Sequence, residues 1–139
     1  MIDAVPMDPV EVFARTLYAE ARTPDLPAIE ALAAVVVNRV PWSADWAVRA
    51  AAVREACLAP WQFACWDPDP ATRAAMATAP GGQVLKLCRR VARRALAGTL
   101  VDPTRGATRY HDRDSAPVWA RGRAPAAEIG GVLFYNDLR

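Results

Sequence analysis

The spacing of apolar residues along the chain predicts five helices. The first spans about residues 9–22, where Asp8 can cap the helix, Pro9 fits its first position and the apolar residues fall on one stripe. The second, over about residues 27–40, is apolar almost all the way round, which indicates a buried central helix. Three further helices are expected over residues 44–58, 70–79 and 83–97.

The pattern changes after Gly98, which can cap the last of these helices. Residues 108–111 and 129–135 are short strand candidates, and residues 61–70 have the tryptophan and proline content of a structured loop. The expected fold class is therefore α+β and mainly helical, with a small C-terminal β element. A length of 139 residues favours one domain over residues 1–139.

Composition and charge narrow the possible partners. The chain is 53% hydrophobic and 23% charged, as in ordinary globular proteins, and its net charge of +2 gives no reason to expect nucleic acid as a partner. The longest apolar run, residues 31–37, is too short for a membrane span, and the N-terminal residues lack the basic region of a secretory signal peptide. We expect a soluble monomer that would need another export route to act outside the cytoplasm.

Glu20 is the strongest candidate for a catalytic group. It stands near the end of the first predicted helix, beside the apolar stripe rather than opposite it. Burial against apolar side chains raises the pKa of a carboxyl group toward the range in which it can act as a general acid. The alternative is an ordinary surface glutamate.

Cysteine and histidine offer a second kind of chemistry. His111 is the only histidine, and Cys65 could pair with it as nucleophile and base, although a buried structural cysteine is the simpler interpretation. A zinc site built from Cys57, Cys65, Cys88 and His111 would lack the paired ligand spacing that such sites use. We therefore expect neither a metal nor any other cofactor.

Aromatic and basic side chains could bind a polymer. Aromatic residues in loop-like regions either stack on sugars or fill the core, and Gln62 beside them could bind hydroxyl or acetamido groups. These residues are Trp61, Phe63, Trp66, Tyr110 and Trp119. A basic stripe at helical spacing, formed by Arg89, Arg90, Arg93 and Arg94, is expected to be a solvated face. The sequence contains no phosphate-binding glycine loop, so nucleotide-dependent chemistry is not expected.

Several segments form an ordered series between residues 12 and 135. They are LYAEAR at 17–22, VVVNRV at 35–40, QFACW at 62–66, DPTRGATRYH at 102–111, PVWA at 117–120, IG at 129–130 and FY at 134–135. This series resembles the SleB-type cell wall hydrolase family, which includes spore cortex-lytic enzymes. The resemblance covers nearly the whole chain and is more specific than any single motif.

The resemblance implies a lysozyme-like fold and cleavage of peptidoglycan glycan strands between N-acetylmuramic acid and N-acetylglucosamine. The catalytic glutamate of the family corresponds to Glu20, and the site of action would be the cell wall, in the periplasm or cell envelope. The sequence departs from the family at Thr23-Pro24, where Gly-Glu is usual, and at Val132, where histidine is frequent. Ala19 replaces a glycine, a small change that need not disturb Glu20.

Lytic transglycosylation, which needs one carboxylate, is the favoured mechanism. Asp102 and Asp112 remain candidates for a two-carboxylate hydrolase. The alternatives are a Cys65–His111 amidase or endopeptidase, and a peptidoglycan-binding module without turnover. The predicted substrate-binding residues are Gln62, Phe63, Trp66, Tyr110, His111 and Trp119.

Overall fold

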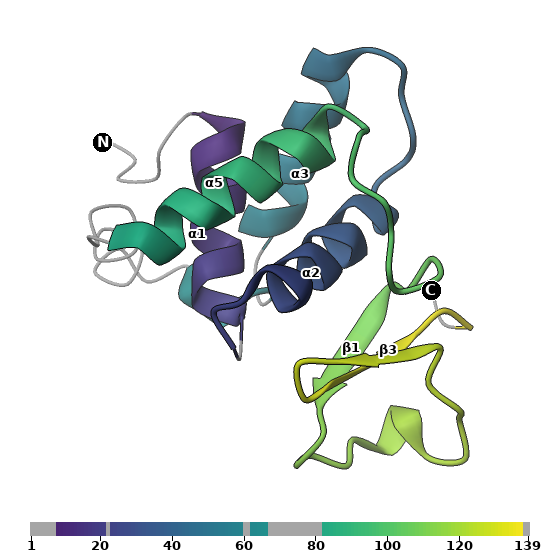
Figure 1. Ribbon diagram of the computed structural model, residues 1–139. Helices are drawn as coiled ribbons and strands as arrows, with labels where there is room; N and C mark the ends of the chain where they lie inside the picture. Colours follow the sequence, from purple (N-terminus) through teal and green to yellow (C-terminus); the bar gives the residue numbers. More distant parts are fainter. Residues whose placement is uncertain (1–7, 22, 60–61, 67–81, 138–139) are drawn as a thin grey trace.

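The computed structural model describes residues 8–21, 23–59, 62–66 and 82–137. Its helical part comprises α1 (Pro9–Glu20), α2 (Leu26–Asn38), α3 (Trp46–Leu58), the short 3-10 helix η1 (Ala64–Trp66) and α5 (Gly82–Leu96) (Figure 1). The C-terminal part comprises β1 (Arg109–Asp112), the 3-10 helix η2 (Val118–Ala120), β2 (Ala127–Ile129) and β3 (Val132–Tyr135). The helix expected over residues 70–79 lies outside the described residues. Within them, the predicted mainly helical α+β fold is confirmed.

Aspartates begin three of the helices. The Asp8 carboxylate accepts a hydrogen bond from the Val10 amide at 2.9 Å, and Asp25 and Asp45 cap α2 and α3 in the same way. At its other end α1 stops at Glu20, two residues earlier than predicted, because Ala21 is in an extended conformation. The glutamate therefore occupies the last helical position and not a position inside the helix.

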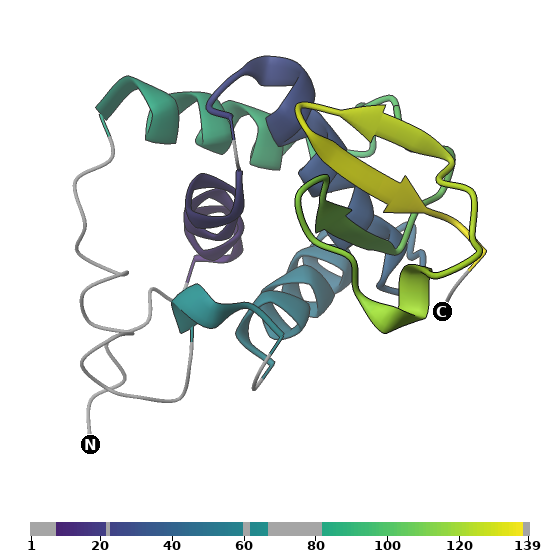
Figure 2. The ribbon, with the colours of Figure 1, turned by 90° about the horizontal axis from the view of Figure 1, so that it is seen from below.

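The core forms where α1 packs against α2, α3 and α5 (Figure 2). Phe13 and Leu17 of α1 are buried there, together with Val35 of α2, Val53 of α3 and Val91 of α5. The predicted burial of the second helix is confirmed, since Ala31, Ala33 and Val35 are fully enclosed. This bundle is the rigid base from which Glu20 projects.

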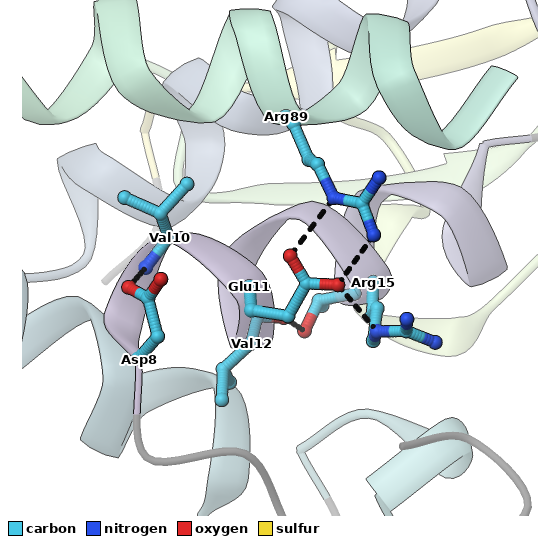
Figure 3. Close-up of polar contacts among 7 residues, drawn as sticks. Asp8, Val10, Glu11, Val12, Arg15 and Arg89 are labelled. Carbon is cyan, nitrogen blue, oxygen red and sulfur yellow. Dashed lines mark hydrogen bonds and ion pairs between the residues drawn. The ribbon is translucent and has the colours of Figure 1, made fainter. Parts of the chain in front are cut away.

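An ion-pair network joins α1 to α5 at the edge of this core (Figure 3). Arg89 donates two hydrogen bonds to the Glu11 carboxylate, at 2.9 and 2.8 Å, and Arg15 donates a third at 2.8 Å. The hydrogen bond from Arg89 holds the pKa of the Glu11 carboxyl below its usual value. The prediction of a solvated basic face is therefore wrong for Arg89, which lies over α1, whereas Arg90 and Arg93 are exposed.

The sheet is antiparallel with strand order β1-β3-β2 and lies beside α2 (Figure 1). The predicted strand over 129–135 is interrupted at Gly130-Gly131, both of which have positive φ and turn the chain from β2 into β3. A Cβ atom on Gly130 would lie 2.9 Å from the Thr23 hydroxyl and 3.0 Å from the Ala28 Cβ. The β turn thus closely approaches the connection between α1 and α2.

All three cysteines are free thiols in the described part of the chain, and Cys57 and Cys88 are buried among the helices. In the same part, no helix is long and apolar enough to cross a membrane.

Candidate active site

Glu20 and Tyr110 meet where the helices adjoin the sheet. The Tyr110 hydroxyl donates a hydrogen bond of 3.2 Å to Glu20 Oε2, which joins the end of α1 to β1. Tyr110 pairs in register with Phe134 of β3, and its ring lies 6.0 Å from the Phe134 ring. The sheet therefore fixes the direction from which the tyrosine reaches the carboxylate.

The surroundings of Glu20 favour its protonated form. Burial is the largest influence and raises the pKa of the carboxyl above its usual value. The Tyr110 hydrogen bond and the positive charge of Arg39 oppose this rise, while the negative charge of Asp112 adds to it. Burial also raises the pKa of Tyr110, so the phenol remains a neutral donor at physiological pH. Glu20 thus has the electrostatic setting of a general acid.

A cleft of about 700 Å³ opens next to this pair. Tyr110 lines it, so one tyrosine touches both the cleft and Glu20. The other lining residues come from the end of α2, the segment before η1, the segment around β1, η2 and the end of β3: Asn38, Arg39, Gln62, Gly106, Thr108, Arg109, Trp119 and Asn136. The volume is within the range of ligand-binding clefts.

The Asn38-Arg39 pair connects α2 to the segment that leads into β1. Asn38 Nδ2 donates to Asp102 Oδ2 at 2.9 Å and to the Ala107 carbonyl at 3.0 Å. Arg39 Nε donates to the Thr108 carbonyl at 2.7 Å. These bonds hold one wall of the cleft in place. They also fix the position at which β1 begins, and therefore the position of Tyr110.

Asp102 organises the same segment. Its Oδ1 accepts from the amide and the hydroxyl of Thr104 at 2.7 and 2.6 Å, and its Oδ2 also accepts from the Gly106 amide at 2.8 Å. Burial opposes ionisation of Asp102, but these hydrogen bonds and the one from Asn38 outweigh it and lower the pKa of the carboxyl. Both oxygens of Asp102 thus accept hydrogen bonds, from its own loop and from Asn38 of α2, and hold this segment in place.

Arg39 is the positively charged residue that influences the pKa of Glu20. Its guanidinium carbon lies 5.7 Å from the centre of the Phe63 ring and 5.9 Å from that of Tyr110, distances typical of cation–π contacts. Burial lowers the pKa of the guanidinium, which nevertheless stays charged because arginine has so high an ordinary value. Arg39 therefore brings a fixed positive charge to the cleft.

The other predicted substrate-binding residues divide into two groups. Gln62 and Trp119 line the cleft, as expected, and Arg109 lies 5.6 Å above the Trp119 ring. His111 points to the opposite face of β1 from Tyr110, because side chains alternate along a strand. Its ring lies 5.4 Å from the ring of Tyr135 and 5.5 Å from that of Trp119. His111 thus supports Trp119 from outside the cleft lining.

Two predicted cleft residues are corrected by the structure. Trp66 is completely buried, and its indole nitrogen donates to the Thr16 hydroxyl at 2.7 Å. Phe63 is only 4% exposed and lies beneath the Arg39 guanidinium. The turn of η1 directs the indole toward α1, where it finds both apolar contacts and a hydrogen-bond acceptor. Trp61 lies outside the described residues.

The ring nitrogens of His111 are both engaged. Because a carbonyl can only accept, Nδ1 donates to the Asp112 carbonyl at 2.7 Å, and Nε2 is hydrogen-bonded to the Tyr135 hydroxyl at 2.9 Å. This leaves the ring without a free nitrogen to activate the Cys65 thiol.

Burial raises the pKa of Cys57 to about 12 and that of Cys88 to about 11. Among the residues the structure describes, no three His, Cys, Asp or Glu side chains gather as metal ligands.

Sequence reasoning gave no role to several residues of the cleft. Asn38 and Arg39 form a polar pair directly after an apolar helix, a signal that could have marked them. Thr108, Arg109 and Asn136 had no such signal, because only the folded sheet brings them to the cleft.

Two solved structures share this fold. The catalytic domain of the Bacillus cereus SleB protein matches with a TM-score of 0.66 and 21% identity, over 97% of this chain and 98% of that one. The catalytic domain of the germination-specific lytic transglycosylase SleB from Bacillus anthracis matches with a TM-score of 0.65 and 22% identity, over 97% and 99%. These likenesses confirm the predicted lysozyme-like fold.

The sequence itself shows the family. None of the curated proteins matches the chain significantly. The model of the cell wall hydrolase family, Hydrolase_2, matches residues 27–135, which include α2 except its first residue, the cleft lining except Asn136, and the whole sheet. Glu20 precedes the matched residues, so the family match does not include it. Because the match covers well over half of the sequence, the chain belongs to the cell wall hydrolase family.

Proposed function

We propose that this protein is a lytic transglycosylase that cleaves peptidoglycan strands between N-acetylmuramic acid and N-acetylglucosamine. The observation that carries the proposal is Glu20, a half-buried carboxyl with a raised pKa, hydrogen-bonded to a tyrosine that lines the cleft. Family membership and the likeness to a structure described as a lytic transglycosylase support the choice of substrate and reaction.

Glu20 would act as both acid and base. In the first step the protonated carboxyl gives its proton to the glycosidic oxygen, the bond to the anomeric carbon of muramic acid breaks, and the acetamido carbonyl of that sugar can stabilise the positive centre. In the second step the C6 hydroxyl of the same sugar attacks the anomeric carbon, and Glu20 takes the hydroxyl proton. The products are a 1,6-anhydromuramic end and a free N-acetylglucosamine hydroxyl, and no water is consumed.

The residues around Glu20 can assist this reaction. Tyr110 is a neutral donor, so it can hydrogen-bond the Glu20 carboxylate that forms after the first step without supplying a proton itself. Gln62 offers an amide to sugar hydroxyl or acetamido groups, and Trp119 offers an aromatic ring at the cleft. Asp102 accepts hydrogen bonds from Asn38 and from its own loop, which favours a mechanism that needs only one carboxylate.

The test replaces Glu20 by glutamine, which keeps the size of the side chain and removes its transferable proton. We expect turnover of purified sacculi to fall at least about 100-fold, the usual contribution of a positioned acid, while binding to sacculi is retained. Glu55→Gln is the matched control, because it makes the same change on the exposed surface of α3. Its turnover should equal that of the wild type.

Product analysis tests the type of reaction. Digests by the wild type should contain 1,6-anhydromuramic ends. Reducing ends alone would indicate hydrolysis with a water molecule, in which case Asp112 and Asp102 would be the candidates for the base. Stem peptides released without glycan cleavage would instead indicate an amidase. Near wild-type turnover by Glu20→Gln would refute the assignment of Glu20.

A further inference from the structure

A tryptophan projects from the connection between α2 and α3. Trp42 is 82% exposed, although burying an aromatic side chain of this size is among the most favourable contacts available to a folding chain. Trp46, four residues later, is 47% exposed. An exposed tryptophan that borders a hollow can serve as an anchor for a ligand.

The loop that carries Trp42 is held firmly. Arg49 Nη1 donates to the Ser43 carbonyl at 2.6 Å, while its Nε and Nη2 donate to the Leu96 carbonyl at 3.1 and 2.7 Å. Asp45, two residues after Ser43, caps α3 through the Ala47 amide at 2.8 Å. Because its loop is tied to α3 and α5, Trp42 loses little backbone freedom when a ligand binds.

Trp42 borders a second hollow of about 220 Å³. Asn38 lines both this hollow and the cleft, so the two lie next to each other. Most of the other residues around the second hollow are apolar: Val37, Val40, Pro41, Val53, Ala95 and Leu96, with Arg49 beside them. A ligand that fills the cleft and continues past Asn38 would therefore reach an apolar pocket with an indole at its margin.

We propose that Trp42 and the hollow it borders bind a further N-acetylhexosamine of the strand whose scissile bond lies at Glu20. The inference rests on the proposed function, because it assumes that a glycan strand occupies the cleft. A hexosamine fits this chemistry: its C–H face can pack on an indole, and its acetamido methyl can enter an apolar hollow. Because Asn38 lines both hollows, a strand in the cleft lies next to the second hollow, so we infer that strand as the occupant rather than a second copy of the chain.

The test compares Trp42→Ala with Trp46→Ala. Trp46 is a matched control because it is a partly exposed tryptophan of the same region that is not among the residues lining either hollow. We expect Trp42→Ala to weaken binding to purified sacculi about tenfold. Trp46→Ala should bind sacculi as the wild type does.

Three results would overturn the proposal. The first is wild-type binding by Trp42→Ala, and the second is an equal loss for both variants, which would indicate a general apolar surface. The third is a wild-type dimer in sedimentation that Trp42→Ala converts to a monomer, which would make a second copy the occupant. If the wild type cleaves sacculi and Trp42→Ala binds normally, only this inference fails. If the wild type releases no glycan products, both the proposed function and this inference fail.

Discussion

Asp102→Asn, which replaces one carboxylate oxygen by an NH₂ group, should destabilise the protein. The new amide keeps one oxygen, which can still accept both Thr104 hydrogen bonds. Its NH₂ group, however, would face the donors of Asn38 and Gly106, so two charge-assisted bonds are replaced by donor–donor contacts. At about 1.5 kcal/mol for each lost bond, the low end for charged partners at a half-exposed site, the loss is about 3 kcal/mol.

Thermal unfolding measures this loss. For a chain of this length about 3 kcal/mol corresponds to a fall in Tm of about 10 °C. Asp137→Asn is the control, because it breaks only an exposed pair with Arg123, and it should change Tm by no more than about 2 °C. The pKa of Asp102 is lowered in the folded state. Its contribution to the free energy of unfolding is therefore complete above the pKa of the unfolded chain, about 4, and is lost as the pH falls below that value. The gap between the wild type and Asp102→Asn should therefore close in acid, and a small or pH-independent gap would refute the reasoning.

Further changes separate the influences on Glu20. Turnover should fall on the alkaline side as Glu20 loses its proton, and Asp112→Asn should move this fall to lower pH, since it removes a negative charge that raises the pKa of Glu20. Tyr110→Phe should move the fall to higher pH, because the hydrogen bond it removes favours the carboxylate; equal shifts in one direction would contradict both assignments. Cys65→Ala should keep its activity, because the ring nitrogens of His111 are already engaged, and a folded but inactive variant would instead support the amidase.

The helical part of the fold followed from local signals. Asp8 caps the first helix and the apolar run of α2 is buried, as the pattern predicted, because helix capping and helical amphipathicity are properties of neighbouring residues. Glu20 was also proposed in this way, since a carboxyl near the end of an amphipathic helix is visible in the sequence. The exact end of α1 was not, because it depends on the extended conformation of Ala21.

The rest of the site depends on contacts between distant residues. Asn38 bonds to residues 64 and 69 positions further on, and Arg39 bonds to one 69 positions further on. No local pattern specifies such pairs. The burial of Trp66 could not be predicted for the same reason. Its irregular segment has no hydrophobic period that distinguishes a buried face from an exposed one. The indole turns inward because Thr16 of α1 accepts its hydrogen bond.

The proton affinity of Glu20 depends on how closely the sheet approaches the helices. Arg39 and Asp112 influence its pKa in opposite directions, and burial is the largest influence. That burial is produced where α1 meets β1, and the position of β1 is fixed by the bonds from Asn38 and Arg39 to the preceding segment. Weakening the Asp102 loop should therefore do more than lower Tm. It should admit water to Glu20 and move the alkaline fall in turnover to lower pH, although Asp102 lies outside the proposed proton transfers.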